Sequence, residues 1–147
     1  MWLCGKHFIG PDPERAMRET RATTAVCLNE PAELHDRYPH YVEWLQLQPR
    51  ERAVWFPIPD LGAPPVDEAT VLLEALSQRV EKGHTLLVHC GAGVGRAGTI
   101  AAALLIYLGS SQDAALAAVA AHRPMAGPEA GAQRELLFSL ENAVPGR

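Results

Sequence analysis

A cysteine and an arginine bracket a glycine-rich loop in the second half of the chain. Cys90 is followed by Gly91-Ala92-Gly93-Val94-Gly95 and then by Arg96. Glycines leave room for a ligand and permit backbone conformations in which successive N–H groups turn inward around an anion. The guanidinium group of Arg96 adds a planar fork of donors that matches two phosphate oxygens. The pattern predicts a phosphate-binding loop with a nucleophile at its base.

The surroundings of Cys90 favour the thiolate form of its sulfur near neutral pH. A hydrophobic strand, residues 85–89, precedes the cysteine, and an apolar helix, residues 97–108, follows the arginine. The positive N-terminal end of that helix and the N–H groups of the loop stabilise negative charge on the sulfur. A thiolate in such a cradle is placed to attack phosphorus. Because side chains alternate along a strand, His89 should face away from the loop and hold the cysteine in position through hydrogen bonds.

Other interpretations of the loop explain fewer of its residues. Gly93, Gly95 and Gly98 fit the Gly-x-Gly-x-x-Gly spacing of a dinucleotide-binding turn only weakly, and no Gly-Lys-Ser/Thr of a Walker loop follows. In the simplest alternative, Cys90 is a small buried hydrophobic residue at an ordinary strand–helix turn. We favour the nucleophile, because the nucleotide interpretations give no role to Cys90 or Arg96.

Hydrolysis of a phosphate ester also needs a proton donor opposite the sulfur. Asp60 is the leading candidate, because it stands in a proline-rich loop, residues 57–65, outside the regular elements. The alternative is that Asp60 only caps the turn at Leu61-Gly62. Asp67 and Glu68 lie nearby, but they fall in the first turn of the next helix, where the helix dipole favours acidic residues.

Strands alternate with helices along the chain. We expect strands at residues 23–28, 53–58 and 85–89, and a short strand or hairpin within residues 2–9. We expect helices at residues 12–20, 66–82, 97–108, 111–122 and 129–143, and a helical segment at residues 31–47 that Pro39 breaks or kinks. This order predicts an α/β fold: a single domain, residues 1–147, with a central, mostly parallel sheet flanked by helices.

Composition argues against several kinds of partner. The formal net charge is −4 without a basic block, which argues against nucleic acid as a partner. The longest apolar stretch, residues 99–108, is too short to cross a bilayer, and no signal peptide is evident, so we expect no membrane partner. Three cysteines favour a reducing, cytoplasmic location and a working thiol. Cys4 and His7 form only half of a metal site, so we expect neither a metal nor another cofactor.

The motif His-Cys-x-x-Gly-x-x-Arg at residues 89–96 resembles the active site of the cysteine-dependent protein tyrosine phosphatases, including their dual-specificity branch. Trp2-Leu3-Cys4-Gly5 and Thr24-Ala25-Val26-Cys27-Leu28-Asn29 are similar to core strands of that branch. Phe56-Pro57-Ile58-Pro59-Asp60, with Gly62 and Pro64, resembles the mobile acid loop of the kinase-associated phosphatases, and Arg123-Pro124 and Gln133 resemble the C-terminal segment. The resemblance spans most of the chain and implies a dual-specificity phosphatase-like fold.

The resemblance also implies roles and one departure. It implies that Gln133 orients the water which hydrolyses a phosphocysteine intermediate, although Gln133 could equally be an exposed residue on a helix face. The family usually has Ser or Thr directly after the loop arginine, where its hydroxyl bonds the cysteine sulfur, whereas this chain has Ala97. Thr99 is close enough in sequence to be a substitute. Cys27 is most simply a core residue, and a minority alternative makes it a thiol that traps oxidised Cys90, as in some relatives.

These observations lead to an expected reaction and to two alternatives. We expect a phosphatase that hydrolyses phosphotyrosine, and phosphoserine or phosphothreonine as well, in a phosphorylated protein or peptide. The chain lacks the long N-terminal segment of the larger tyrosine phosphatases, which suggests a shallow site, and the loop holds no lysine for highly anionic lipids. The alternatives are a phosphatase of a small phosphorylated metabolite and a catalytically weak phosphate-binding or adaptor module, for which Ala97 is the only hint. The sequence does not predict an oligomeric state.

Overall fold

Four strands form one parallel sheet in the computed structural model, which describes residues 1–143. They are β1 (Trp2–Gly5), β2 (Thr24–Cys27), β3 (Ala53–Trp55) and β4 (Leu86–Cys90), and their order in the sheet is β1-β4-β2-β3. Every pair of neighbours runs in the same direction. The predicted α/β fold with a mostly parallel sheet is therefore confirmed, and β4, which carries Cys90, lies inside the sheet rather than at its edge.

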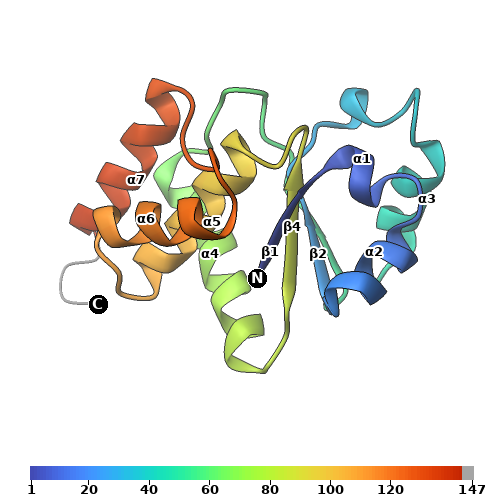
Figure 1. Cartoon of the computed structure of the whole chain (residues 1–147), viewed down its shortest axis with the longest axis horizontal. Coiled ribbons are helices and arrows are strands. Elements are labelled where there is room, and N and C mark those ends of the chain that lie inside the picture. The colour runs from blue at the N-terminus through green and yellow to red at the C-terminus, as the bar shows by residue number, and fades with distance from the viewer. Residues whose placement is uncertain (144–147) are drawn as a thin grey trace.

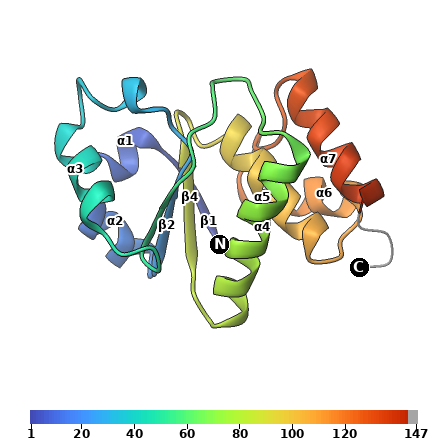
Figure 2. The same cartoon turned by 180° about the vertical axis from the view of Figure 1, so that it is seen from behind.

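Helices cover both faces of the sheet (Figures 1 and 2). On one face lie α1 (Lys6–Ile9), α2 (Pro13–Thr20), the 3₁₀ turn η1 (Pro31–Glu33) and α3 (Pro39–Leu47). On the other face lie α4 (Val66–Glu81), α5 (Gly95–Tyr107), α6 (Gln112–His122) and α7 (Gly131–Ala143). The two views show three layers, with the sheet edge-on in the middle.

Two hydrophobic clusters fill the spaces between these layers. The larger cluster joins α4, α5, α6 and α7 to one face of the sheet, and almost all of α5 is buried in it, as its all-round apolar sequence predicts. The smaller cluster joins α2 and α3 to the opposite face, around the buried ring of Tyr41. Because α5 is surrounded, its first turn, next to Cys90, is held rigidly in place.

Prolines and caps set most helix starts where the sequence predicts them. The side chain of Asp12 accepts a hydrogen bond from the N–H of Arg15, and that of Ser111 accepts one from the N–H of Ala114. Pro39 neither breaks nor kinks a helix. It is the first residue of α3, a position that needs no backbone N–H, so residues 31–47 divide into η1 and α3.

The structure corrects three further expectations. Residues 2–9 contain strand β1 and the short helix α1, not a hairpin. The strand expected at residues 53–58 ends at Trp55, because Pro57 and Pro59 leave the ladder. The last helix begins at Gly131, two residues later than expected, and residues 128–130 before it are irregular. No helix of residues 1–143 has the length and apolarity of a membrane span.

The parallel arrangement places four connections at one edge of the sheet. The carboxyl ends of β1, β2, β3 and β4 lead into α1, the η1 segment, the proline-rich loop and the phosphate loop, respectively. Figure 1 shows these connections together at the top of the molecule. In open parallel sheets, ligands bind beyond this edge.

Candidate active site

Residues 91–96, here called the phosphate loop, run from the end of β4 into the first turn of α5. Gly93 has a left-handed φ of +76°, and a Cβ atom there would lie 2.5 Å from the carbonyl carbon of Cys4. Only glycine combines this conformation with so close an approach to β1. The N–H of Lys6 also donates to the carbonyl of Gly91 at 3.0 Å. The loop is therefore fixed by the neighbouring strand as well as by its own sequence.

Cys90 lies at the base of the loop with its thiol nearly buried. The residue is 3% exposed, and its Sγ accepts a hydrogen bond from the N–H of Ala97 at 3.4 Å. Ala97 is in the first turn of α5, so the positive end of the helix dipole faces the sulfur. The predicted stabilisation of negative charge on Cys90 thus has a geometric basis.

Arg96 is held in one orientation by a carboxylate that the sequence analysis missed. Its Nη1 donates to Oε2 of Glu33 at 2.8 Å and its Nη2 donates to Oε1 at 2.7 Å, while Nη1 also donates to the carbonyl of Ile58 at 2.8 Å. These three bonds leave the Nε hydrogen and one Nη2 hydrogen of the guanidinium outside the contacts to Glu33 and Ile58. The two remaining donors lie on one edge of the fork, which suits bidentate binding of phosphate.

Glu33 is itself held by the backbone and by a neighbour. The N–H of Glu30 donates to Oε2 at 2.7 Å, and Nδ2 of Asn29 donates to Oε1 at 3.1 Å. Burial raises the pKa of Glu33, but the hydrogen bonds and charge of Arg96 outweigh burial and lower that pKa to about 2. Burial likewise lowers the pKa of Arg96, and Glu33 raises it above its ordinary value. Both groups stay charged throughout the pH range of ordinary assays.

Asp60 extends over the site from the proline-rich loop. Its Oδ1 lies 3.6 Å from Nη2 of Arg96, and 77% of its side chain is exposed. Oδ1 also accepts a hydrogen bond from the N–H of Leu61 at 3.0 Å, which is the local turn contact of the alternative interpretation. The structure therefore brings together Cys90, Arg96 and Asp60, and the turn contact does not remove the carboxyl group from the site.

His89 faces away from the phosphate loop, as strand alternation predicts. Its Nε2 is 2.5 Å from the hydroxyl of Tyr41, and its Nδ1 is 3.5 Å from the carbonyl of Cys90. Complete burial lowers the pKa of His89 to about 4, against the small opposing effect of the Cys90 carbonyl. The ring is thus neutral, accepts from Tyr41 and directs its Nδ1–H toward the residue that carries the nucleophile.

Gln133 is buried and not exposed on a helix face. Its Oε1 accepts from the N–H of Glu129 at 2.7 Å, and its Nε2 donates to the carbonyl of Gly62 at 3.2 Å. Gln133 therefore joins the proline-rich loop to the segment before α7. Its role in orienting the hydrolytic water stays a prediction. The same segment brings the Glu129 carboxylate to the phosphate loop, where a Cβ on Gly95 would lie 2.1 Å from Oε1.

Thr99 does not substitute for the missing hydroxyl after Arg96. Its Oγ1 is buried and has no hydrogen-bond partner among the residues that the structure describes. The Ala97 N–H is the group that reaches the sulfur. Ala97 is fully buried, so the position of the usual hydroxyl is closed to bulk water.

A second cation, to which the sequence analysis gave no role, contacts the phosphate loop from outside. Nε of Arg123 donates to the carbonyl of Gly93 at 2.8 Å, and its Nη2 donates to the carbonyl of Ala92 at 2.9 Å. The Arg123-Pro124 dipeptide was the available signal. Because the N–H groups of an anion-binding loop converge on the ligand, Arg123 satisfies carbonyls that point the other way.

The other two thiols pack across the sheet from the nucleophile. Cys4 and Cys27 both pair in register with His89 and belong to the smaller cluster, whereas Cys90 belongs to the larger one. Burial raises the pKa of each to about 12. All three cysteines are unpaired, and trapping of oxidised Cys90 by Cys27 stays a hypothesis. No group of three or more potential metal ligands occurs within residues 1–143.

Comparisons with known proteins agree with this geometry. A family model described as the Swiss Army Knife protein, DSP-PTPase phosphatase domain, matches residues 3–137. The crystal structure of Tk-PTP in its active form is 34% identical, with a TM-score of 0.72, over 89% of this chain and 87% of that one. Kinase associated phosphatase with a substituted catalytic cysteine, at 20% identity and a TM-score of 0.74 over 90% of this chain and 76% of that one, shares the fold.

Curated relatives match over a shorter segment. Cyclin-dependent kinase inhibitor 3 of Rattus norvegicus is 38% identical over 55 residues, which are 37% of this chain and 26% of that protein. The protein of the same name from Sus scrofa is 40% identical over 52 residues. The match spans about a quarter of the length of these relatives. The family model and Tk-PTP cover most of the chain, and the chain accordingly belongs to the DSP-PTPase phosphatase domain family.

Proposed function

We propose that this chain is a protein phosphatase that hydrolyses phosphotyrosine, and also phosphoserine or phosphothreonine, through a phosphocysteine intermediate. The observation that carries the proposal is the position of Arg96. Two of its donors are not used by Glu33 or Ile58, and the carboxyl group of Asp60 lies 3.6 Å from its Nη2. Arg96 closes the loop that begins at the buried Cys90. Membership in a phosphatase domain family supports the reaction class.

In the first step, the thiolate of Cys90 attacks phosphorus, the S–P bond forms, and the bond between phosphorus and the substrate oxygen breaks. The loop N–H groups and Arg96 bind the phosphoryl oxygens as charge redistributes over them. Protonated Asp60 donates its proton to the departing oxygen, so that the product leaves as a neutral alcohol or phenol.

In the second step, water attacks the phosphorus of phosphocysteine and the S–P bond breaks. Asp60, now ionised, accepts a proton from the water, and inorganic phosphate is released. The N–H of Ala97 donates to the sulfur that regains its negative charge. Each turnover restores both the thiolate and the acid.

A phosphorylated small molecule is the competing substrate. One solved neighbour at 20% identity is PTPMT1 in complex with PI(5)P, with a TM-score of 0.75 over 97% of this chain and 88% of that one. That similarity extends to the fold, and residues 91–95 of this chain contain no lysine for additional phosphate groups. Protein phosphate esters therefore remain our proposed substrate. The unpaired cysteines support our proposal of a reducing, cytoplasmic location.

A substrate screen with active-site variants tests the proposal. Purified protein is assayed against matched phosphotyrosine, phosphoserine and phosphothreonine peptides and against phosphorylated metabolites, with and without a chelator. We expect turnover of phosphotyrosine peptide by the wild type, none by Cys90→Ser, and severe loss in Arg96→Lys, because an ammonium group cannot replace the bidentate fork. Cys90→Ser should still bind inorganic phosphate. Turnover by Cys90→Ser, or loss of wild-type activity with chelator, would overturn the mechanism, and preference for a metabolite would overturn the substrate.

A further inference from the structure

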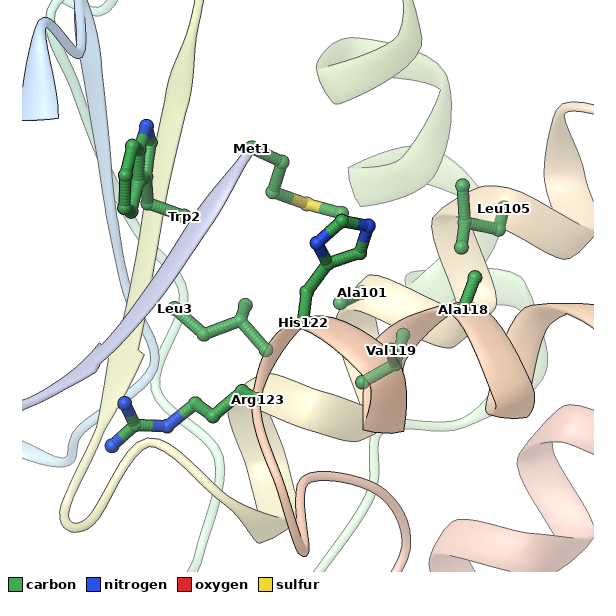
Figure 3. Close-up of a pocket in the computed structure, with 9 residues that line it drawn as sticks. All are labelled: Met1, Trp2, Leu3, Ala101, Leu105, Ala118, Val119, His122 and Arg123. Atoms are coloured by element: carbon green, nitrogen blue, oxygen red, sulfur yellow. The ribbon is translucent and has the colours of Figure 1, made fainter.

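A cavity separate from the phosphate loop lies at the edge of the sheet, between β1 and the helices α5 and α6 (Figure 3). Its volume is about 550 Å³, within the range of small-molecule sites. No residue of the phosphate loop is among the described residues that line it. The proposed reaction gives this cavity no role.

The wall of the cavity is apolar, with a corner formed by an imidazole and by the side chain of an arginine. Leu3 of β1, Ala101 and Leu105 of α5, and Val119 of α6 form the apolar part, and His122 and Arg123 form the corner. In Figure 3 the imidazole ring of His122 projects into the space, beside the side chain of Met1. None of the described lining residues is acidic. Apolar surface that ends at the side chain of an arginine, which is always charged, suits an apolar molecule that carries one anionic group.

Arg123 connects this cavity to the phosphate loop. The stem of its side chain lines the cavity, and its guanidinium group points away from the cavity in Figure 3. That guanidinium donates to the carbonyls of Gly93 and Ala92 at 2.8 and 2.9 Å. A single side chain therefore forms part of one site and holds the backbone of the other.

The hydrogen-bond partners of the Arg123 guanidinium are neutral carbonyls, so an anionic ligand could draw this side chain to a new position. It has no carboxylate partner in an ion pair within residues 1–143. A carboxylate in the cavity would attract this guanidinium by its opposite charge, which the neutral loop carbonyls lack, and would therefore compete with them. Arg96, by contrast, already has Glu33 and would not respond.

We propose that the cavity binds a small apolar monocarboxylate and that its occupancy lowers phosphatase activity by drawing Arg123 away from the phosphate loop. The activity part of this proposal rests on the proposed function, whereas the binding part does not. The two states are the loop with Arg123 bound to its carbonyls and the loop without that support. Because coupling between two sites is reciprocal, inorganic phosphate in the loop should weaken binding in the cavity by the same factor.

Octanoate is a suitable probe, with octanol and acetate as controls that remove the charge or the chain. In an amide NMR titration of the whole protein, we expect saturable shifts at Leu3, Leu105 and Val119, and also at Gly93. Octanol and acetate should bind at least fivefold more weakly. At saturating octanoate, kcat toward a phosphotyrosine peptide should fall at least threefold without a matching rise in KM.

Filling the cavity provides a matched pair of variants. Ala118 lines the cavity on α6, whereas its neighbour Ala117 is exposed and does not. Ala118→Phe should abolish the octanoate shifts and the inhibition, and Ala117→Phe should retain both. Basal activity of each should stay within twofold of wild type.

Several results would overturn the proposal. They are an absence of saturable shifts at the lining amides, and equal octanoate binding by the two alanine variants. A third is weakening of octanoate binding that grows in proportion to phosphate without reaching a limit, which would place octanoate in the loop. Binding that leaves both Gly93 and kcat unchanged would overturn the coupling. If no substrate is hydrolysed, the proposed function is wrong but the binding proposal can still be tested. The NMR shifts of the lining amides and of Gly93 are measured without catalysis.

Discussion

The guanidinium group of Arg96 and the carboxylate of Glu33 are joined by two parallel hydrogen bonds of 2.7 and 2.8 Å. The arginine follows β4 and the glutamate follows β2, which is the neighbouring strand in the sheet. The pair fixes the plane of the guanidinium before any substrate arrives, so that its remaining donors are already directed at the position of phosphate. Because the donors are already in place, no free energy is spent on reorienting them at the moment of reaction.

Glu33→Gln should impair catalysis without unfolding the protein. The amide keeps the shape of the side chain but replaces one acceptor by a donor that faces Arg96. The loss of one hydrogen bond between charged partners, about 1.5–3 kcal/mol, predicts a roughly 10- to 100-fold fall in kcat/KM toward a phosphotyrosine peptide. Inhibition by inorganic phosphate should weaken in parallel, because the same fork binds the ground state.

Glu43→Gln is the control for this change, since Glu43 is exposed on α3 and should leave kcat/KM within twofold. If Glu33→Gln also retains wild-type kcat/KM and phosphate inhibition, then Arg96 does not need the ion pair to be oriented.

Asp60→Asn should lower kcat by about 10²- to 10⁴-fold, the usual contribution of a general acid. The fall should be larger for a tyrosine phosphate peptide than for an activated aryl phosphate, whose leaving group needs less protonation.

Asp67→Asn is the control for this change, because Asp67 lies in the first turn of α4 and the substitution should leave kcat unchanged. An unaltered kcat of Asp60→Asn with both substrates would transfer the role of acid to Asp67 or another residue.

The sequence predicts those parts of the site that are contiguous. Cys90, Arg96 and the intervening glycines form one strand–loop–helix unit, whose chemistry follows from local rules alone. Asp60 is recognisable because prolines surround it and remove it from regular structure. The order and direction of the strands follow from the alternation of elements, which the parallel sheet confirms.

The missed residues act through contacts between distant segments. Glu33 lies 63 positions before Arg96, and its acidic side chain in η1 resembles an ordinary capping residue until the pairing of β2 with β4 is known. Arg123 lies 30 positions after Gly93, in a turn whose direction depends on how α6 packs on α5. The burial of Gln133 has the same origin, because its partner Gly62 belongs to another connection. No local pattern specifies these pairings.

The neutral state of His89 predicts how stability depends on pH. Burial lowers its pKa to about 4 in the folded protein, below the ordinary value of 6.5. Between these values the unfolded chain binds a proton that the folded chain does not, so the free energy of unfolding should fall as pH decreases from about 6.5 toward 4. Above pH 6.5 this contribution should be constant.

Urea denaturation at pH 7.5, 6.5, 5.5 and 4.8 measures this dependence above the range in which carboxylates such as Glu33 lose their charge. Over this interval the wild type should lose at least about 1 kcal/mol of stability, the free energy of roughly one pKa unit. His89→Gln should show a flatter profile, whereas His40→Gln, at an exposed position, should retain the wild-type profile. An equally steep profile in His89→Gln would assign the dependence to other groups.

The alanine after Arg96 predicts which step limits turnover. Cys90 attacks phosphorus in the first step and must depart from it in the second. A hydroxyl at position 97 would stabilise the departing thiolate by about 1.5–3 kcal/mol. Within residues 1–143 the N–H of Ala97 donates to the sulfur at 3.4 Å, and the hydroxyl of Thr99 is not bonded to it. The second step should therefore be slowed by about 10- to 100-fold, and phosphocysteine should accumulate.

Rapid mixing with an activated aryl phosphate measures the difference in rate between the first and the second step. The wild type should release a burst that approaches one phenolate per enzyme before the slower steady state. Ala97→Ser should raise steady-state kcat and shrink the burst, because the added hydroxyl assists the second step more than the first. Ala102→Ser adds a hydroxyl at another fully buried position of α5 and should change neither quantity. If the wild type shows no burst and Ala97→Ser leaves kcat unchanged, a bound water or Thr99 in a different rotamer already supplies the missing donor.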